Sequence, residues 1–265
     1  MPSATAPDVL AAILGATRRI VEIRRASVPE SALERDAVAA PRAASRFTDA
    51  LSAPGRLRVI AECKRRSPSR GVLRAKYDPV AIARGYEAAG ASAVSVLTEP
   101  TFFDGAPEHL RAVRAAVSLP ILRKDFIVDR YQVLEAVAWG ADAVLLIAAA
   151  LDDRELESLL HVCRERRVDA LVEVHDRAEL QRALDAGAAI VGVNNRNLRT
   201  LGMDGSTAED LVSAIPDCAL AVAESGLRTA GDLERLAAMG YDAFLIGERL
   251  VCAPDPGGAL AELLA

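Results

Sequence analysis

A unit of strand, loop and amphipathic helix repeats eight times after residue 57 of this 265-residue chain, and this repeat constrains the fold most strongly. Short apolar runs predict strands, and longer segments with apolar residues at helical spacing predict helices. The predicted strands cover residues 58–63, 93–97, 120–124, 143–148, 170–174, 190–194, 219–223 and 243–246. The predicted helices cover residues 79–89, 106–116, 129–139, 152–166, 177–186, 207–214, 228–239 and 256–264.

The junctions between the predicted helices and the strands that follow them resemble one another. A glycine stands at four of these junctions, as expected just past the end of a helix: Gly90, Gly140, Gly187 and Gly240. The phrases Trp139-Gly140-Ala141-Asp142-Ala143 and Met239-Gly240-Tyr241-Asp242-Ala243 are near-copies of each other. The chain is therefore expected to use one helix-to-strand turn several times.

Eight alternating units predict an α/β fold of the (β/α)8 TIM barrel type. An open, doubly wound sheet is the alternative, but it usually has fewer units, and no GxGxxG follows the first strand. Residues 1–50 differ from the rest, with apolar residues such as Leu10 and Ile13 at helical spacing among arginines. We expect an N-terminal helical extension over 1–50, with further helices over 30–39 and 45–51, packed on a barrel over 51–265.

Composition limits the class of protein and its partners. The formal charge of −5 disfavours nucleic acid as a partner, and an aromatic content of 4% within 51% hydrophobic residues predicts an aliphatic core. The four cysteines and three histidines form no CxxC, HExxH or cluster, so no structural zinc is expected. The thiols are interpreted as buried in a reduced cytoplasm, and no signal peptide or membrane-spanning run is found.

Polar residues at the carboxyl ends of the predicted strands indicate an active site, because barrel enzymes place their sites there. Side chains alternate along a strand, so Glu62 and Lys64 share one face, whereas Cys63 lies on the other. The same argument directs Lys124 inward and Arg123 outward. The remaining inward residues are Glu173, Asn194, Arg196 and Glu224. Buried charges are costly, so charged groups from five strands at one mouth favour a functional site over a structural one.

The charges of this set favour an anionic ligand. Three carboxylates could hold magnesium, but the interleaved Lys64, Lys124 and Arg196 would repel the metal and attract an anion. A lysine in an apolar mouth can also have its pKa lowered toward neutrality, which would suit acid–base chemistry. Gly226 and Gly247 follow the seventh and eighth strands, where backbone N–H groups of this fold bind phosphate.

At these residues the sequence resembles the indole-3-glycerol-phosphate synthase family, the barrel enzymes of tryptophan biosynthesis. The matching phrases occur in the family's order across the whole barrel, and the N-terminal extension is also similar. The phrases are Ile60-Ala61-Glu62-Cys63-Lys64-Arg65-Arg66-Ser67-Pro68-Ser69, Ser95-Val96-Leu97-Thr98-Glu99, Leu122-Arg123-Lys124-Asp125-Phe126-Ile127, Leu171-Val172-Glu173-Val174-His175, Gly192-Val193-Asn194-Asn195-Arg196-Asn197-Leu198 and Ala223-Glu224-Ser225-Gly226.

The resemblance implies a reaction and its catalytic residues. The family converts 1-(2-carboxyphenylamino)-1-deoxyribulose 5-phosphate into indole-3-glycerol phosphate, carbon dioxide and water, with no metal and no cofactor. Lys124 is implied as the general acid of ring closure and Glu173 as the second acid–base group, working in the dehydration. Glu62 and Asn194 would orient the reacting hydroxyls. Lys64 would lie near the substrate's anionic groups, and Ser225 would complete the site.

The resemblance also implies the substrate-binding residues. Phe126 would line the wall against the anthranilate ring, Ser67 lies in the mobile first loop, and Arg196 holds the polar network. The other residues expected to contact substrate are Phe103, Glu224, Gly226, Gly247 and Glu248. Glu248 departs from a small hydroxyl residue at its position, so its side chain must point away if its backbone N–H binds phosphate. His175 is expected to cap its strand rather than to catalyse.

Three other readings remain open at this stage. One is a phosphoribosylanthranilate isomerase, which would need a Cys and Asp pair, although Cys63 faces outward. Another is a Schiff-base aldolase that uses Lys124, and a third is a barrel that binds a phosphorylated ligand without catalysis. In every case we expect a small-molecule partner and a cytoplasmic monomer, with neither nucleic acid nor membrane bound.

Overall fold

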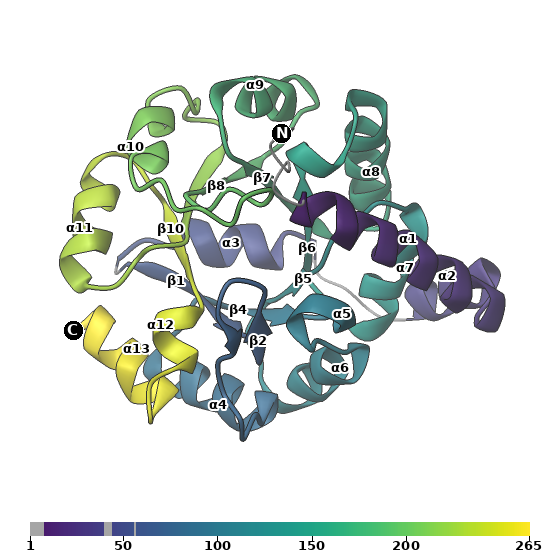
Figure 1. Ribbon diagram of the computed structural model, residues 1–265, viewed down its shortest axis with the longest axis horizontal. Helices are drawn as coiled ribbons and strands as arrows, with labels where there is room; N and C mark the ends of the chain where they lie inside the picture. Colours follow the sequence, from purple (N-terminus) through teal and green to yellow (C-terminus); the bar gives the residue numbers. More distant parts are fainter. Residues whose placement is uncertain (1–7, 40–43, 56) are drawn as a thin grey trace, which may run out of the picture.

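Eight parallel strands close into a barrel in the computed structural model, which describes residues 8–39, 44–55 and 57–265 (Figure 1). The strands are hydrogen-bonded around the barrel in the order β1, β10, β9, β8, β7, β6, β5, β4 and back to β1. Their bounds are β1 Arg58–Cys63, β4 Ala93–Leu97, β5 Ile121–Lys124, β6 Ala143–Ile147, β7 Asp169–Val174, β8 Ile190–Asn194, β9 Leu220–Glu224 and β10 Ala243–Ile246. Closure confirms the predicted (β/α)8 barrel and excludes the open sheet.

The predicted helices surround the barrel and differ from expectation only at their ends. They are α4 Pro79–Ala89, α6 Pro107–Ala116, α7 Arg130–Trp139, α8 Asp153–Glu165, α9 Arg177–Asp185, α10 Thr207–Val212, α11 Ala230–Ala238 and α13 Pro256–Leu264. Aspartate side chains begin several of them; Asp129, for example, accepts a hydrogen bond from the Tyr131 backbone N–H at 2.8 Å. The core between strands and helices consists mainly of buried Val, Leu, Ile and Ala, as the composition predicted.

The repeated helix-to-strand turn is real, and it ties each unit to its neighbour. Gly140 and Gly240 adopt positive φ angles of 90° and 114°, which glycine tolerates best. The aspartate two residues later then accepts a hydrogen bond from the first residues of the preceding strand. Asp142 accepts from Ile121 N at 2.9 Å, and Asp242 accepts from Ala221 N at 2.8 Å. The repeat in the sequence is therefore a repeat of hydrogen bonds.

Several short elements lie where the sequence predicted only loops. Residues after β1 form an antiparallel hairpin from β2 (Arg66–Ser67) and β3 (Gly71–Val72). The other short elements are α5 (Pro100–Phe103), the 3-10 turn η1 (Ala148–Ala150) and α12 (Glu248–Val251). Elements of two to four residues are too short to produce a periodic apolar pattern, so only tertiary contacts define them.

The N-terminal helices contact both ends of the barrel. In α1 (Val9–Ser27), Leu10 and Ile13 join the main core, and α2 (Glu30–Ala39) follows against α7. In α3 (Arg46–Ser52), Phe47 and Leu51 are fully buried, and the Thr48 N–H donates to the Asp169 carboxylate at the start of β7. Helix α3 therefore closes the amino-terminal end of the barrel. Residues 1–7 and 40–43 of the predicted extension lie outside the described residues.

The expectation of buried thiols is only half right. Cys63 and Cys163 are buried, whereas Cys218 and Cys252 are exposed, and Cys252 stands beside the main pocket. Exposure depends on where a loop lies in space, which a lone cysteine in the sequence does not reveal. Within the described ranges, no helix is long and apolar enough to cross a membrane.

Candidate active site

A pocket of about 550 Å³ opens at the carboxyl ends of the barrel strands. Every residue predicted from the sequence for the site lines this pocket. These residues are Glu62, Lys64, Ser67, Phe103, Lys124, Phe126, Glu173, Asn194, Arg196, Glu224, Ser225, Gly226, Gly247 and Glu248. The positions of the strand residues among them follow from alternation, whereas Phe103, Glu248 and the loop residues were expected from the resemblance or from their place after a strand. The chemical roles of all of them need the local geometry.

Lys124 is the centre of the charged group at the base of the pocket. Its Nζ lies 3.1 Å from Glu173 Oε2 and 3.6 Å from Glu224 Oε2, and its side chain is 15% exposed. Burial alone would lower the pKa of Lys124, but the negative charges of Glu173, Glu224 and Glu62 outweigh burial and raise it. The sequence-based expectation of a lowered lysine pKa is therefore wrong, because three carboxylates, and not an apolar wall, surround the ammonium. The Lys124 side chain is therefore protonated at neutral pH.

Glu173 has a second cationic neighbour that the sequence analysis assigned only to the strand end. His175 Nε2 lies 3.3 Å from Glu173 Oε1, and His175 Nδ1 lies 3.0 Å from Glu179 Oε2. Burial lowers the pKa of His175, but its two carboxylate neighbours raise it to about 10. Burial in turn raises the pKa of Glu173, yet Lys124 and His175 lower it below its ordinary range. Glu173 is consequently ionised.

The pKa of Glu224 shifts in the opposite direction to that of Glu173. Burial and the adjacent Glu173 charge raise the pKa of Glu224, although Lys124 partly opposes them. One carboxyl group of the pair is therefore held ionised while the other tends to keep a proton. This division is typical of acid–base sites in which two carboxyl groups share one environment.

Two glycines leave room for the carboxylates. A Cβ on Gly192 of β8 would lie 2.2 Å from Glu224 Oε1, and a Cβ on Gly247 would lie 2.3 Å from Glu62 Oε1. The sequence analysis interpreted Gly247 only as a backbone contact for phosphate and gave Gly192 no role. Their spatial requirement is visible only after the barrel has brought β8 beside β9 and β10 beside β1.

Glu62 and Asn194 each contact the residue two positions later in the chain. Lys64 Nζ lies 2.6 Å from Glu62 Oε1, so the two residues of β1 and its following loop form an ion pair inside the pocket. The Asn194 side-chain oxygen accepts a hydrogen bond from the Arg196 N–H at 2.9 Å. This contact fixes the turn after β8 and leaves the Asn194 amide group at the pocket wall.

An apolar slot adjoins the charged base. The rings of Phe103 and Phe126 contribute to its lining and pack against each other, with centroids 6.1 Å apart and planes inclined by 37°. Several apolar lining residues were missed from the sequence. These are Ile13 from α1, Leu97 from β4, Leu145 and Ile147 from β6, and Leu198, Leu201 and Met203 from the loop after β8. The last three lie in an irregular segment without periodicity, and Ile13 belongs to a helix far away in the sequence.

The opposite wall of the pocket suits an anionic group. Ser225 and Gly226 both have positive φ angles, 64° and 83°, which curve the backbone after β9 around the pocket. Gly247 precedes the start of α12, where the first backbone N–H groups of a helix have no partner within it. Arg196 and the exposed Arg228 line the same region, and Arg228 was not predicted from the sequence.

The carboxylate of Glu248 is paired with arginines. Arg70, from the hairpin after β1, places Nη1 at 2.6 Å from Glu248 Oε1, and Arg196 Nη2 lies 3.9 Å from Oε2. The side chain is thus turned toward Arg70 and its charge is balanced. This pairing removes the repulsion that the sequence analysis expected between Glu248 and a nearby phosphate.

Fold and site together define a barrel enzyme that performs acid–base chemistry on an anionic substrate with an apolar, planar part. The family model described as indole-3-glycerol phosphate synthase matches residues 10–263. The chain belongs to the indole-3-glycerol phosphate synthase family, whose members are carboxy-lyases of tryptophan biosynthesis.

Relatives with this name cover almost the whole chain. Indole-3-glycerol phosphate synthase of Chlorobium luteolum is 52% identical over 91% of this chain and 92% of its own length. The protein of the same name from Azospirillum brasilense is 44% identical over 97% of this chain and 99% of its own length.

Solved structures of low sequence identity share the barrel. KGPDC from Streptococcus mutans superimposes with a TM-score of 0.61 at 13% identity, covering 79% of this chain and 96% of that one. Thiamine phosphate pyrophosphorylase from Pyrococcus furiosus gives a TM-score of 0.59 at 17% identity, covering 78% of this chain and 93% of that one. These similarities support the fold alone.

Proposed function

We propose that this site closes the indole ring of 1-(2-carboxyphenylamino)-1-deoxyribulose 5-phosphate, with Lys124 as general acid and Glu173 as the second acid–base group. The anthranilate ring would pack against the apolar part of the pocket that Phe103 and Phe126 line. The phosphate would lie on the opposite wall, near Arg196, Gly226 and Gly247. A cytoplasmic monomer that binds neither membrane nor nucleic acid remains our expectation.

Ring closure requires a proton donor at the substrate ketone. The ring carbon that bears the carboxylate attacks the ketone carbon, a carbon–carbon bond forms, and the ketone oxygen becomes a hydroxyl by taking a proton from Lys124. Decarboxylation then restores the aromatic ring, since the electrons of the bond to carbon dioxide remain with the ring. The apolar slot favours this step, because a departing carboxylate becomes a neutral molecule.

Dehydration needs one proton given and one taken. The new hydroxyl leaves as water with a proton from the site, and the five-membered ring loses a proton to form the indole double bond. Glu173 and Glu224 suit this exchange as a pair, because Glu173 is held ionised and Glu224 tends to retain a proton. Glu62 and Asn194 orient the hydroxyl groups, and Lys64 lies near the substrate's anionic groups. Ser225 and Ser67 contribute polar contacts at the rim.

One observation carries this proposal: the Lys124 ammonium contacts both Glu173 and Glu224 in a pocket that Phe103 and Phe126 also line. The surroundings of Lys124 and of Cys63 disfavour two of the alternatives. A Schiff-base aldolase needs a neutral lysine, whereas the pKa of Lys124 is raised. An isomerase with a cysteine acid–base group is disfavoured because Cys63 is fully buried, outside the pocket lining, and burial raises the pKa of its thiol.

The direct test is formation of indole-3-glycerol phosphate, followed by ultraviolet absorbance and fluorescence, with the parent enzyme and Lys124→Ala. We expect product from the parent and a loss of about 10²- to 10⁴-fold in kcat in the variant, the usual contribution of a positioned general acid. Circular dichroism of both proteins controls for folding. Product formed equally well by both proteins would remove Lys124 from its role, and no product from a folded parent would overturn the proposed function.

A further inference from the structure

Arg123 lies directly beside Lys124 in β5 but faces away from the pocket, toward α7. Its side chain has no exposed surface, and its guanidinium lies 4.3 Å from the centroid of the Trp139 ring. A guanidinium that is fully removed from water must satisfy its donors within the protein. The hydrogen-bond partners of the guanidinium therefore indicate which segments Arg123 holds together.

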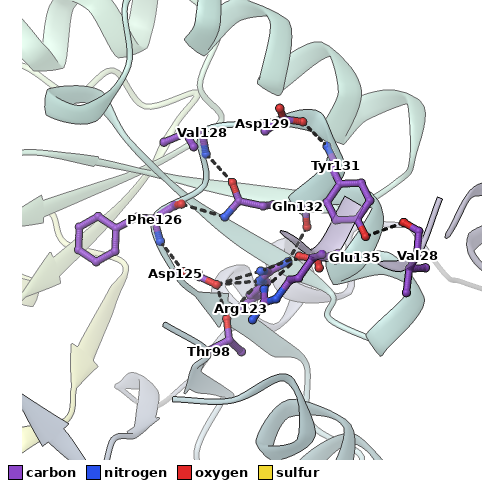
Figure 2. Close-up of polar contacts among 11 residues, drawn as sticks. Val28, Thr98, Arg123, Asp125, Phe126, Val128, Asp129, Tyr131, Gln132 and Glu135 are labelled. Carbon is purple, nitrogen blue, oxygen red and sulfur yellow. Dashed lines mark hydrogen bonds and ion pairs between the residues drawn. The ribbon is translucent and has the colours of Figure 1, made fainter. Parts of the chain in front are cut away.

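The guanidinium joins three segments around the end of β5 (Figure 2). Its Nη2 donates to Asp125 Oδ2 at 2.9 Å and to Glu135 Oε2 at 3.1 Å. Its Nη1 donates to the Gln132 backbone oxygen at 2.6 Å, and its Nε donates to Thr98 Oγ1 at 3.1 Å. Strand β5, the loop after β4 and helix α7 thus meet at one side chain.

Asp125 and Gln132 extend these contacts to the turn over residues 125–128, which leads from β5 toward α7. Asp125 Oδ1 accepts a hydrogen bond from the Phe126 N–H at 2.9 Å, so the same carboxylate contacts Arg123 and the turn. Gln132 Nε2 donates to the Phe126 oxygen, and Gln132 Oε1 accepts from the Val128 N–H, both at 2.9 Å. Both backbone polar groups of Phe126 are therefore fixed by side chains.

The last residue of β5 and this turn carry the two groups on which ring closure depends, Lys124 and Phe126. The ring of Phe126 points away from the polar contacts (Figure 2) and faces Phe103 in the pocket. Lys124 lies between Arg123 and Asp125 in the chain, and its backbone oxygen accepts from the Thr98 N–H at 3.1 Å. A displacement of the turn would alter the position of the apolar slot relative to the ammonium.

Stability alone does not account for this arrangement. Buried ion pairs often contribute little to the free energy of folding, because desolvation offsets their attraction. A planar guanidinium instead fixes the relative positions of the segments around it, because its several donors point in fixed directions and bind different segments.

We propose that Arg123, Asp125 and Gln132 are positioning residues, which hold the turn over residues 125–128 so that the Lys124 ammonium and the Phe126 ring keep the separation that ring closure needs. This inference rests on the proposed function and goes beyond it, because none of the three is assigned a contact with the reacting atoms. A misplacement of about 1 Å in such a site costs on the order of 100-fold in rate.

The first variant is Gln132→Met, which removes both side-chain hydrogen bonds to the turn without leaving a buried charge unpaired. We expect kcat/KM to fall on the order of 100-fold, mainly through kcat, because the relative position of ring and acid matters most in the transition state. Amide hydrogen exchange of the Val128 N–H should accelerate in the same protein. Arg123→Lys is the second variant, since it keeps the charge but cannot bridge Asp125 and the Gln132 oxygen as a fork, and we expect the same direction of change.

Arg111→Met is the matched control. Arg111, on α6, also lies over the Trp139 ring, with its guanidinium 5.5 Å from the centroid, but it is exposed. It should keep the parent's kcat, KM and Val128 exchange, which separates the loss of a cation near Trp139 from the loss of the turn contacts. Circular dichroism at the assay temperature establishes that each variant is folded.

The two proposals fail in different ways. A parent enzyme that forms no product would overturn the proposed function. Amide hydrogen exchange at Val128 in the Gln132→Met variant would still test whether Gln132 holds the turn. A folded Gln132→Met enzyme with the parent's kcat/KM, or with unchanged exchange at Val128, would overturn the positioning role and leave the reaction intact.

Discussion

At the residue scale, the charge states of the site are set by neighbours that come from different strands. The sequence places Lys124, Glu173 and Glu224 at strand ends, but it does not show that one ammonium contacts both carboxylates. That contact reverses the expected direction of the Lys124 pKa. It also explains why two glutamates of the same chemistry differ in protonation, because the ammonium and His175 both face Glu173.

His175 should control the acidic limb of the activity profile. Its imidazolium lies 3.3 Å from Glu173 Oε1, so His175→Gln removes a positive charge that favours the ionised carboxylate. We expect the pKa of Glu173 to rise and the acidic limb of the kcat/KM profile to move to higher pH. The measurement is kcat/KM as a function of pH for parent and variant, and superimposable acidic limbs would contradict it.

His161→Gln is the control for this change, because His161 is exposed and pairs with Glu165 of its own helix, at 3.4 Å. The variants should differ in stability as well. The folded-state pKa of His175 is about 10, above its ordinary value of 6.5, so its stabilising contribution is complete below about 6.5 and disappears as pH rises through about 10. Urea unfolding of His175→Gln should therefore show a larger loss relative to the parent at pH 6 than at pH 10.

At the element scale, the barrel register decides which small residues are obligatory. Asn194 of β8 pairs with Glu224 of β9, which brings Gly192 under the Glu224 side chain. Side-chain alternation predicts that Glu224 points inward, but it does not reveal what lies beneath it. The repeated turns ending in Asp142 and Asp242 show the reverse case, since their role could be inferred from the sequence itself.

Gly192→Ala should reduce activity by displacing Glu224. The new Cβ would lie 2.2 Å from Glu224 Oε1, so the carboxylate must move from its place beside Lys124. We expect kcat to fall at least about tenfold, since general acid–base groups contribute 10²- to 10⁴-fold when correctly placed. Steady-state kinetics on the folded variant checks this, and parent-like kcat would show that Glu224 is not needed where it stands.

Gly15→Ala is the matched glycine control. Gly15 lies in α1, and a Cβ there meets nothing within 4 Å. An exposed glycine inside a helix is less favourable than alanine by about 1 kcal/mol, so Gly15→Ala should slightly raise the free energy of unfolding and leave kcat unchanged.

At the scale of the whole molecule, the two ends of the barrel differ: one is closed by apolar packing and the other carries the pocket. Helix α3 closes the amino-terminal end with Phe47 and Leu51, which are fully buried. The carboxyl-terminal end carries the pocket, the hairpin after β1 and the α1 residue Ile13. Contacts at one end should therefore govern stability, and contacts at the other end should govern turnover.

Phe47→Ala tests this division. Truncation of a buried phenylalanine removes about 3–5 kcal/mol from the free energy of unfolding, so the urea midpoint should fall strongly. At a temperature where the variant is still folded, kcat and KM should match the parent, because Phe47 does not line the pocket.

Phe103→Ala is the corresponding substitution at the end of the barrel that carries the pocket. Phe103 is only partly buried, packs against Phe126 and lines the pocket. Its truncation should raise KM and lower kcat/KM while costing less stability than Phe47→Ala. Equal loss of activity in the two variants would contradict the separation of the two ends.

Much of the fold and the inward-facing site could be predicted from the sequence, because alternation and periodicity are local properties. The eight strands, their helices and the inward-facing charged residues at the strand ends follow from patterns that extend over a few positions, whereas Ser67, Phe103 and Glu248 were expected only from the family resemblance. The misses have two causes. Ile13 and the spatial roles of Gly192 and Gly247 depend on residues distant in the chain. The contact of His175 with Glu173, only two residues away, depends instead on how the two side chains are turned.

The sequence by itself determined the order of the elements, the closed barrel and the faces on which the charged groups lie. Hydrophobic burial acts along each segment, so the pattern of apolar residues carries this information. Only the tertiary structure decided which charge meets which, because Coulomb interactions and close packing depend on distances of a few ångströms between separate elements. The raised pKa of Lys124 and the Arg123 contacts that hold the Phe126 turn belong to this second kind.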